Sequence, residues 1–322
     1  MADPPGHTRT RKLLTAAFTS KAVARLEERA RAITNEHLNR ILAKGEFEMM
    51  ADLANLLPMI ILAEMLGVDP ARRAEFKRWS DDAMIVVARD HSEEDVLRIV
   101  QSRKDFRAFF RALIVECRES PREDLISDLV RAQVEGDMLT ADEVVRLSII
   151  LLLAGNVTTT NLHGNGMNLL LRHPEALAML RADETLIPGF IEEVLRSDGN
   201  AKFLPRRTAR ETTIAGVTIP KDEYVIALLA SANRDPTHFP DPDRFDIERE
   251  QCDHVAFGFG IHSCVGAPLA RLEGKVVFEE ILRRLPDFSA AEEQRVWMRS
   301  ATIRGLKRLP IKLNRKMVTA AQ

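Results

Sequence analysis

Cysteine is scarce in this chain, which has only three among its 322 residues, at positions 117, 252 and 264. A small, odd number of cysteines does not make a disulfide framework and favours a reducing compartment. Aromatic residues are also few, at 5% with one Tyr and two Trp, which argues against a base-stacking surface for nucleic acid. The formal net charge is only −2, so no overall field attracts nucleic acid or a membrane surface.

Long apolar segments are lacking as well. The longest apolar run, Ile149–Ala154 with Leu147 just before it, is far shorter than the ~20 residues that span a bilayer. The first residues, MADPPGHTRTRK, are polar and basic and contain no apolar stretch of the kind found in signal peptides. We therefore expect a cytoplasmic protein with no membrane insertion and no nucleic-acid partner.

The hydrophobic pattern predicts that the first two thirds of the chain are helical. Apolar residues recur at every third or fourth position around residues 23–42, 47–66 and 96–115, as they do on one face of an amphipathic helix. Thr140 and Glu143 have the spacing of a capping box, which satisfies the free backbone donors at a helix start. The helix that begins there can extend to about Arg172, before His173-Pro174.

The residue pattern changes after residue 200 from helical periodicity to short β-branched segments and loops. Two short β-branched segments, 212–219 and 224–229, flank Pro220-Lys-Asp222 and predict a hairpin. Residues 233–253 are rich in Pro, Asp and Arg and predict a long loop, which is functional or disordered at that length. The fold class is therefore mainly α with a minor β part. We expect one domain over 1–322, with a helix-rich core at 1–200, a hairpin at 212–229, a loop with the last cysteine at 233–266 and a C-terminal helix and β region at 267–322.

Residues 254–274, HVAFGFGIHSCVGAPLARLEG, crowd glycines and phenylalanines around Cys264. Most free cysteines are buried and inert. A hydrolase nucleophile with His262 as its base would need an acyl-transfer signature, and none surrounds it. A zinc site would need further ligands of the CxxC or HExxH type, which are absent, and so is GxGxxG. A fourth interpretation is a metal thiolate that precedes a helix start, and such a site matches a heme whose ligand is cysteine.

FGFGIHSCVG, residues 257–266, resembles the heme-binding signature FGxGxHxCxG of the cytochrome P450 monooxygenases at every fixed position. Glu193-Val-Leu-Arg196 is similar to the family's ExxR pair, and Asp243-Arg244-Phe245 is similar to its PERF box. The resemblance covers essentially the whole chain and is greatest to the soluble bacterial branch. It implies the cytochrome P450 fold.

The resemblance assigns heme b to this chain, with its iron ligated by the thiolate of Cys264. It implies that the heme propionates are bound by His262, Arg206, His7 and Arg11, with Arg207 as an alternative to Arg206. Two propionates are anions inside a fold, and they need paired cations. Phe257, Gly258 and Gly266 belong to the same loop. The resemblance also implies a structural cluster of Glu193, Arg196 and Arg244.

Ala154-Gly155-Asn156-Val157-Thr158 resembles the family's AGx(E/D)T motif in its long central helix. The resemblance makes Gly155, Asn156 and Thr158 catalytic, with small residues that let the backbone open and a Thr158 hydroxyl that donates a hydrogen bond on the oxygen side. Val157 replaces the family's acid and cannot relay protons. Asn156, Thr159, water or a substrate hydroxyl could take over, and inefficient monooxygenation, uncoupling to peroxide and a non-hydroxylating reaction stay open.

The beginning of the chain departs from the family too. Family members usually carry strands and helices before the helix that contains the HTRxR motif, and here that motif begins at His7. The hypothesis is that Met1 marks a truncated or misassigned start, and the alternative is a short protein that has lost a lid. An intact native mass equal to that of this chain would contradict the hypothesis.

The implied reaction inserts one oxygen atom from O₂ into a small apolar organic substrate. Electrons would come from a separate ferredoxin and its reductase, because nothing here resembles a flavin or NAD(P)H domain. The expected docking patch is basic and consists of Arg9, Arg11, Lys12, Arg271 and Lys275. The expected substrate pocket consists of Leu152, Ala154, Gly155 and Thr158, residues 201–204 with Phe203 and Leu204, and residues 301–303 with Thr302.

Two other functions are open at this point. The first is a catalytically impaired or non-catalytic heme-binding remnant of the same family, which would share the spectrum of the enzyme without its turnover. The second is a cysteine hydrolase, which would be active without heme.

Overall fold

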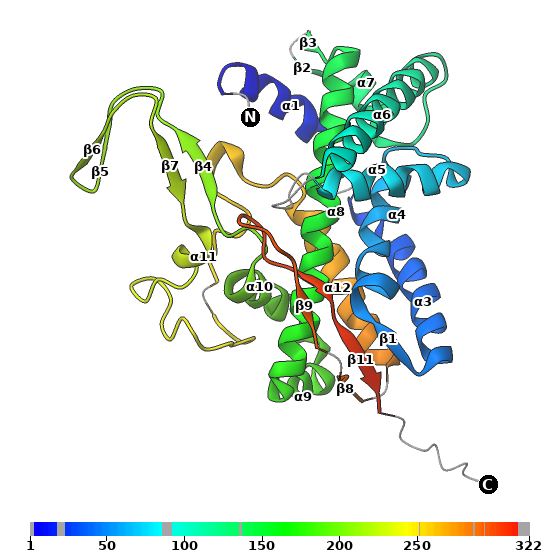
Figure 1. Ribbon diagram of the computed structural model, residues 1–322, viewed down its shortest axis with the longest axis vertical. Coiled ribbons are helices and arrows are strands. Elements are labelled where there is room, and N and C mark those ends of the chain that lie inside the picture. The colour runs from blue at the N-terminus through cyan, green and yellow to red at the C-terminus, as the bar shows by residue number, and fades with distance from the viewer. Residues whose placement is uncertain are drawn as a thin grey trace.

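The computed structural model describes residues 3–17, 23–85, 92–134, 137–250, 252–285, 287–292 and 294–314. Most of them are helical, and small antiparallel sheets lie at the periphery (Figure 1). The helices are α1 (Gly6–Ala17), α3 (Glu27–Lys44), α4 (Leu56–Met65), α5 (Arg73–Ile85), α6 (Glu93–Glu119), α7 (Leu125–Arg131), α8 (Ala141–Arg172), α9 (Pro174–Ala182), α10 (Ile187–Asp198), α11 (Leu229–Ala232) and α12 (Ala267–Arg284).

The strands form antiparallel pairs and one three-stranded sheet. In the latter, β11 (Pro310–Leu313) lies between β1 (Glu46–Glu48) and β8 (Phe288–Ala290), so a strand from the first fifth of the chain pairs with one close to its C-terminus. The pairs are β2 (Gln133–Val134) with β3 (Asp137–Met138), β4 (Leu204–Arg207) with β7 (Tyr224–Ala227), β5 (Thr212–Ile214) with β6 (Val217–Ile219), and β9 (Val296–Trp297) with β10 (Leu306–Arg308).

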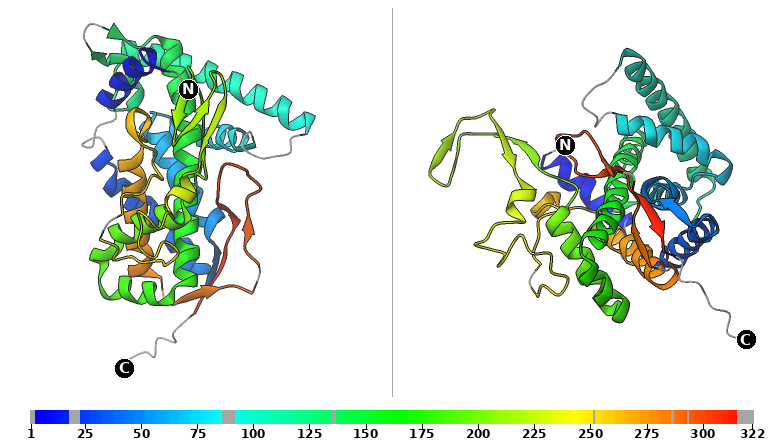
Figure 2. Two further views of the ribbon diagram at one scale, coloured as in Figure 1. Left: turned by 90° about the vertical axis from the view of Figure 1, so that its left-hand side faces the viewer. Right: turned by 60° about the horizontal axis from the view of Figure 1, so that its bottom comes forward.

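Helix α8 runs along the long axis of the molecule, with α12 beside it and the other elements around it (Figures 1 and 2). Its start has the predicted capping box: the Thr140 hydroxyl accepts from the Glu143 N–H, and the Glu143 carboxylate accepts from the Thr140 N–H at 2.8 Å. Contrary to the expected opening at Gly155, the helix continues unbroken to Arg172 and ends before Pro174.

The centre of the core lies where α8, α10 and α12 cross. Phe190 and Phe278 pack edge to face there, with ring centroids 4.8 Å apart. A Cβ at Gly166 of α8 would lie 2.5 Å from the Phe278 ring, so glycine lets these helices approach closely. By length and composition α8 alone among the helices of the described residues could cross a membrane, and 56% of its most apolar window is buried inside the protein.

Two sequence predictions of local structure need correction. Residues 47–66 are not one helix, because β1 and a π-helical turn at Met50–Ala54 precede α4. The predicted hairpin between 212–219 and 224–229 is also wrong. Residues 212–219 fold on themselves as β5 and β6 around Ala215 and Gly216, which both have positive φ, and 224–227 pair with β4 instead.

Candidate functional site

The last residues of the long segment between α11 and α12 form a tight loop that presents Cys264. Gly258 and Gly260 adopt φ values of +71° and +70°, a conformation that favours glycine, and the N–H of Cys264 donates to the carbonyl of Phe257 at 2.8 Å. Helix α12 begins three residues later. The glycine spacing of the motif therefore closes a tight loop that holds the cysteine just before a helix N-terminus.

Cys264 is exposed to solvent. Partial desolvation of its thiol raises its pKa, while the N–H groups of Gly266 and Ala267 and the charges of Arg11 and Arg271 act in the opposite direction. In the part of the chain that the structure describes, no three His, Cys, Asp or Glu side chains gather as metal ligands. Cys264 therefore stands as a single thiol in a cationic surrounding.

Four basic side chains from three elements converge beside this loop. The rings of His7 on α1 and His262 lie 4.1 Å apart. Partial burial lowers the pKa of His262, and the neighbouring His7, Arg206 and Arg11 lower it further, with only Asp3 opposing them. The Nδ1 atom of His7 is buried without a hydrogen-bond partner among the described residues. Such a cluster suits anionic groups that the chain itself does not supply.

The structure distinguishes Arg206 from Arg207, which the sequence left as alternatives for a heme propionate. Arg206 and Arg207 are neighbours on β4, and their side chains point to opposite faces of the strand. Arg207 forms an ion pair with Asp222 at 3.3 Å, whereas the charge of Arg206 acts on His262. Arg206 is thus the one that joins the basic cluster.

Glu193 and Arg196, which the family resemblance placed in a structural cluster, form a buried ion pair. Two hydrogen bonds of 2.7 Å join the guanidinium to the carboxylate, and both side chains are at most 1% exposed. Arg196 also donates to the carbonyls of Asn233 and Pro242, so it fixes the loop after α11. The pair holds this loop against α10.

Arg244, however, does not complete the cluster. Its side chain is 69% exposed, and only its backbone carbonyl accepts from Arg196. Arg249 takes its place, with Nε 3.3 Å from Glu193 and a side chain 9% exposed. Arg249 further donates to the carbonyls of Pro240 and Asp241. The only sequence signal for it was a second arginine five residues after Arg244.

The oxygen-side motif turns around α8, with Ala154 on an exposed face of the helix and Asn156 and Val157 buried. Ile150, Leu153 and Ala154 are exposed there, whereas Leu152 is 3% exposed and packs in the core, so the expected pocket position of Leu152 is wrong. The 100° turn per residue puts neighbouring side chains on different faces. A Cβ at Gly155 would make only an ordinary 3.6 Å contact with Leu62, so no close approach requires glycine here.

The polar groups of this motif are turned toward the protein. The Thr158 hydroxyl donates to the carbonyl of Ala154, one turn back on its own helix. Asn156 is buried and its Nδ2 donates to the Ser80 hydroxyl on α5, while its Oδ1 has no partner among the described residues. Val157 is buried as well.

The structure brings the two other expected pocket segments together. Ala201 and Ile303 form an isolated β-bridge, and the Lys202 N–H donates to the Thr302 carbonyl at 2.9 Å. Phe203 and Leu204 follow directly and are half-buried, while Thr302 is exposed. These two segments therefore form one unit, which we call the paired wall (residues 198–204 and 295–306).

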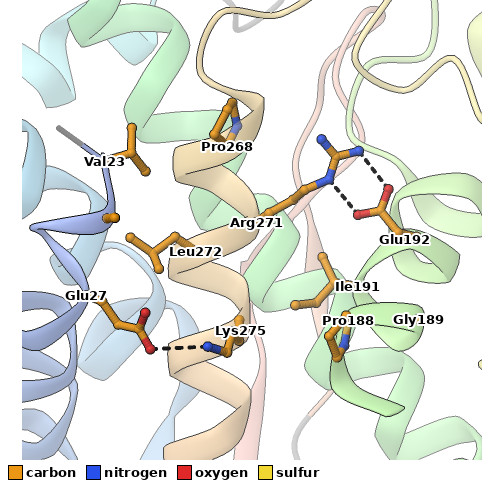
Figure 3. Close-up of a pocket in the computed structure, with 11 residues that line it drawn as sticks. Val23, Glu27, Pro188, Gly189, Ile191, Glu192, Pro268, Arg271, Leu272 and Lys275 are labelled. Atoms are coloured by element: carbon orange, nitrogen blue, oxygen red, sulfur yellow. Dashed lines mark hydrogen bonds and ion pairs between the residues drawn. The ribbon is translucent and has the colours of Figure 1, made fainter. Parts of the chain in front are cut away.

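A separate cavity of about 450 Å³ lies between the start of α3, α10 and α12 (Figure 3). Its floor is apolar, and two ion pairs flank it: Arg271 with Glu192 at 2.7 Å and Lys275 with Glu27 at 3.2 Å. Burial would raise the pKa of Glu192, but its contacts with Arg271 and His254 prevail and lower it to about 2. The expected pocket residues do not line this cavity.

The expected basic docking patch is largely neutralised. Arg271 and Lys275 are paired as described, and Arg9 donates to Asp137 on β3 and to Glu143 at the start of α8. Ion pairs within the chain thus occupy Arg9, Arg271 and Lys275. Sequence could not show this, because the partners lie on distant segments.

Comparison with known proteins identifies the family. Residues 1–314 match the family model of cytochrome P450. The chain belongs to the cytochrome P450 family. Cytochrome P450 monooxygenase PikC of Streptomyces venezuelae is 40% identical over 320 residues, which cover 98% of this chain and 75% of that protein.

Solved cytochrome P450 structures share the fold. CYP109Q5 from Chondromyces apiculatus is 46% identical with a TM-score of 0.91, over 97% of this chain and 78% of that one. CYP109E1 from Bacillus megaterium, solved in complex with testosterone, is 36% identical with a TM-score of 0.93, over 98% and 86%. As a cytochrome P450, this protein is an oxidoreductase of the monooxygenase family that binds heme through a cysteine thiolate.

Proposed function

We propose that this protein is a heme-thiolate monooxygenase that inserts one oxygen atom from O₂ into a small apolar organic substrate, with electrons from a separate ferredoxin and its reductase in the cytoplasm. The observation that carries the proposal is the accessible Cys264 thiol beside the basic cluster of His7, Arg11, Arg206 and His262.

In this proposal Cys264 is the iron ligand, and the basic cluster holds the heme propionates. The buried, unpaired His7 Nδ1 and the crowding of positive charge around His262 support it, because two carboxylates would satisfy both. When bound, the heme supplies oxygen activation, with a thiolate that favours O–O cleavage. Phe257 belongs to the same loop as Cys264, and the guanidinium carbon of Arg271 lies 4.7 Å from the centroid of the Phe257 ring.

The exposed apolar stripe of α8 supports an apolar substrate. Ile150 and Leu153 are large apolar side chains that are 57% and 36% exposed, and the paired wall carries Phe203 and Leu204. The complex of CYP109E1 with testosterone shows an apolar ligand in a relative of the same fold. Thr158 would serve as the hydrogen-bond donor on this side once its hydroxyl rotates away from the Ala154 carbonyl.

The surface of the Cys264 loop supports a protein electron donor. Phe259 and Ile261 are 88% and 58% exposed, an unusual pair of apolar side chains on a loop tip. Arg11 lies near the same loop and adds positive charge. We infer that these residues, rather than the paired Arg271, Lys275 and Arg9, meet an acidic ferredoxin.

The carbon monoxide difference spectrum of the reduced holoprotein tests the ligand. We expect the red-shifted Soret band of a heme thiolate, its loss in Cys264→Ala, and its retention in Cys252→Ala, the control cysteine. A Cys264→Ala protein that keeps the band would overturn the assignment. Substrate-dependent product with a ferredoxin system then tests the reaction, and holoprotein without any product from a broad panel would contradict it.

One observation favours a second function, a catalytically impaired heme protein of the same family. Val157 is a buried apolar residue where the family has an acid, and the Asn156 amide beside it is engaged with Ser80 rather than with the open face. Proton delivery from this helix is therefore incomplete. Consumption of electrons with release of peroxide, in place of product, would identify this function.

A further inference from the structure

Three asparagines of α8 face the paired wall from inside the core. Asn161, Asn165 and Asn168 are each at most 1% exposed, and their spacing of four and three residues puts them on one side of the helix. Burial of an amide is unfavourable unless it contacts a fitting partner. We refer to these three residues as the asparagine ladder.

Each member of the ladder contacts the second segment of the wall. Asn168 Oδ1 accepts from Arg295 at 2.8 Å, and Asn165 Nδ2 lies 3.4 Å from the Arg304 carbonyl. Asn161 packs against Gly305, where a Cβ would lie 2.0 Å from its Oδ1, so no larger residue fits there. The ladder therefore fixes the position of residues 295–305 along α8.

The first segment of the wall is tied to the same helix. Asn165 Nδ2 donates to the Asp198 carbonyl at 2.8 Å, and Asn200 Nδ2 donates to the Thr158 carbonyl at 2.9 Å. Asn165 thus reaches both segments at once. Because Thr158 belongs to the oxygen-side motif, the wall is anchored directly at that motif.

An ion pair locks the two segments to each other. The guanidinium of Arg304 pairs with the largely buried carboxylate of Asp198, and it lies 4.1 Å from the centroid of the Trp297 ring. The Arg304 N–H also donates to the Asn200 carbonyl at 2.7 Å. The Ala201–Ile303 bridge and the exposed Thr302 lie next to this ion pair in the sequence of both segments.

We propose that the asparagine ladder and the Asp198–Arg304 pair are positioning residues that set the distance between the paired wall and α8, and so determine the size of ligand that the pocket accepts. The proposal rests on the proposed function, because it takes the exposed face of α8 as the substrate side. These residues lie behind the wall and need not touch substrate.

Binding of two azoles of different size to the ferric holoprotein tests this inference. Imidazole and 4-phenylimidazole both coordinate heme iron, and the second is larger by a phenyl ring, which on this proposal reaches the wall. In Arg304→Ala we expect the Kd of 4-phenylimidazole to rise about tenfold and that of imidazole to change less than about twofold. Arg304→Lys, which keeps the charge, is expected to recover part of the affinity.

Arg283→Ala is the matched control, because Arg283 is 46% exposed and pairs with Glu184 at 2.6 Å, whereas Arg304 is 41% exposed. It should leave both constants unchanged. Equal changes for both azoles in Arg304→Ala, or no change for either, would overturn the proposal. If Arg304→Ala incorporates no heme, Asp198→Asn is measured in its place with the same criteria.

Azole binding needs neither an electron donor nor turnover. A protein with no monooxygenase activity can therefore still confirm the anchoring role, and a normal monooxygenase can still contradict it. The carbon monoxide spectrum of each variant shows separately whether the thiolate ligand is intact.

Discussion

At the scale of single residues, the most informative contrast is between two arginines that follow α11. Arg244 matched the family's pattern, but Arg249 is the residue that reaches the buried Glu193. Sequence similarity located the segment, and the packing of the loop decided which side chain turned inward. A pattern of residues cannot specify this, because both arginines lie in a loop without a regular period.

The difference between these arginines predicts opposite outcomes for their removal. Arg249→Ala removes hydrogen bonds to three loop carbonyls and to Glu193, and we expect it to lower the free energy of unfolding by about 3 kcal/mol. Arg244→Ala removes a mostly exposed side chain and should change it by less than about 0.5 kcal/mol. Denaturant unfolding of the holoprotein measures both. Equal decreases in the free energy of unfolding would show that Arg244 contributes to the cluster as much as Arg249 does.

Val157 leads to a second prediction at this scale. Val157→Glu places a proton carrier where the family has one, and we expect about a tenfold increase in product formed per electron pair, with less peroxide. Val157→Gln has the same size without the carboxylate and serves as the control. If the Gln variant gains as much as the Glu variant, proton delivery is not what Val157 limits.

At the scale of elements, α8 shows how far local rules extend. Its capping box, its length and its end before Pro174 all follow from sequence, because caps and proline act within a few residues. The β5–β6 hairpin was missed since two turns competed, at 215–216 and 220–222, and only the pairing of 224–227 with the distant β4 excluded the second one.

The cap of α8 is expected to stabilise the whole helix. Thr140→Ala removes the hydroxyl that accepts from the Glu143 N–H, and we expect the free energy of unfolding to fall by about 1 kcal/mol. Thr213→Ala, an exposed strand residue of β5, controls for the loss of a hydroxyl outside a cap. A thermal or denaturant scan in which both variants behave alike would contradict the role of the cap.

At the scale of the whole molecule, two buried titratable groups set the response of stability to pH. Burial raises the pKa of Glu273 from 4.5 to about 8. Burial lowers the pKa of His163 from 6.5 to about 3, although the carbonyls of Ala54 and Glu273 oppose it. Glu273 therefore contributes stability that is present below pH 4.5 and is lost as pH rises through 8. His163 contributes stability that is present above pH 6.5 and is lost as pH falls through 3.

The two contributions cancel between pH 4.5 and 6.5, so we expect a plateau there and a decline on either side. Above the plateau the slope from Glu273 is about 1.4 kcal/mol per pH unit. Glu273→Gln should remove this alkaline decline, and the plateau should become a rise with pH up to about 6.5, since the His163 contribution is then no longer cancelled. Unfolding free energies of both proteins from pH 5 to pH 8 measure it, and parallel curves would show that Glu273 does not titrate in this range.

How much of the molecule sequence could predict depends on the range of the interactions. The fold class and the Glu193–Arg196 pair were correct because motifs of a few residues carry them. The neutralised basic patch, the inward Arg249 and the asparagine ladder were not foreseen. Each depends on partners that are far away in the chain, and no local pattern specifies such partners.

The basic cluster brings together residues that are about 250 positions apart in the sequence, since His7 and Arg11 lie on α1 and His262 lies just before α12. Contacts between such distant segments form late in folding, because closing so long a loop is entropically costly. A nascent chain that has not yet released its last third therefore has no complete heme site. Capture of the cofactor would then report that folding is finished, and it would stabilise only the finished state.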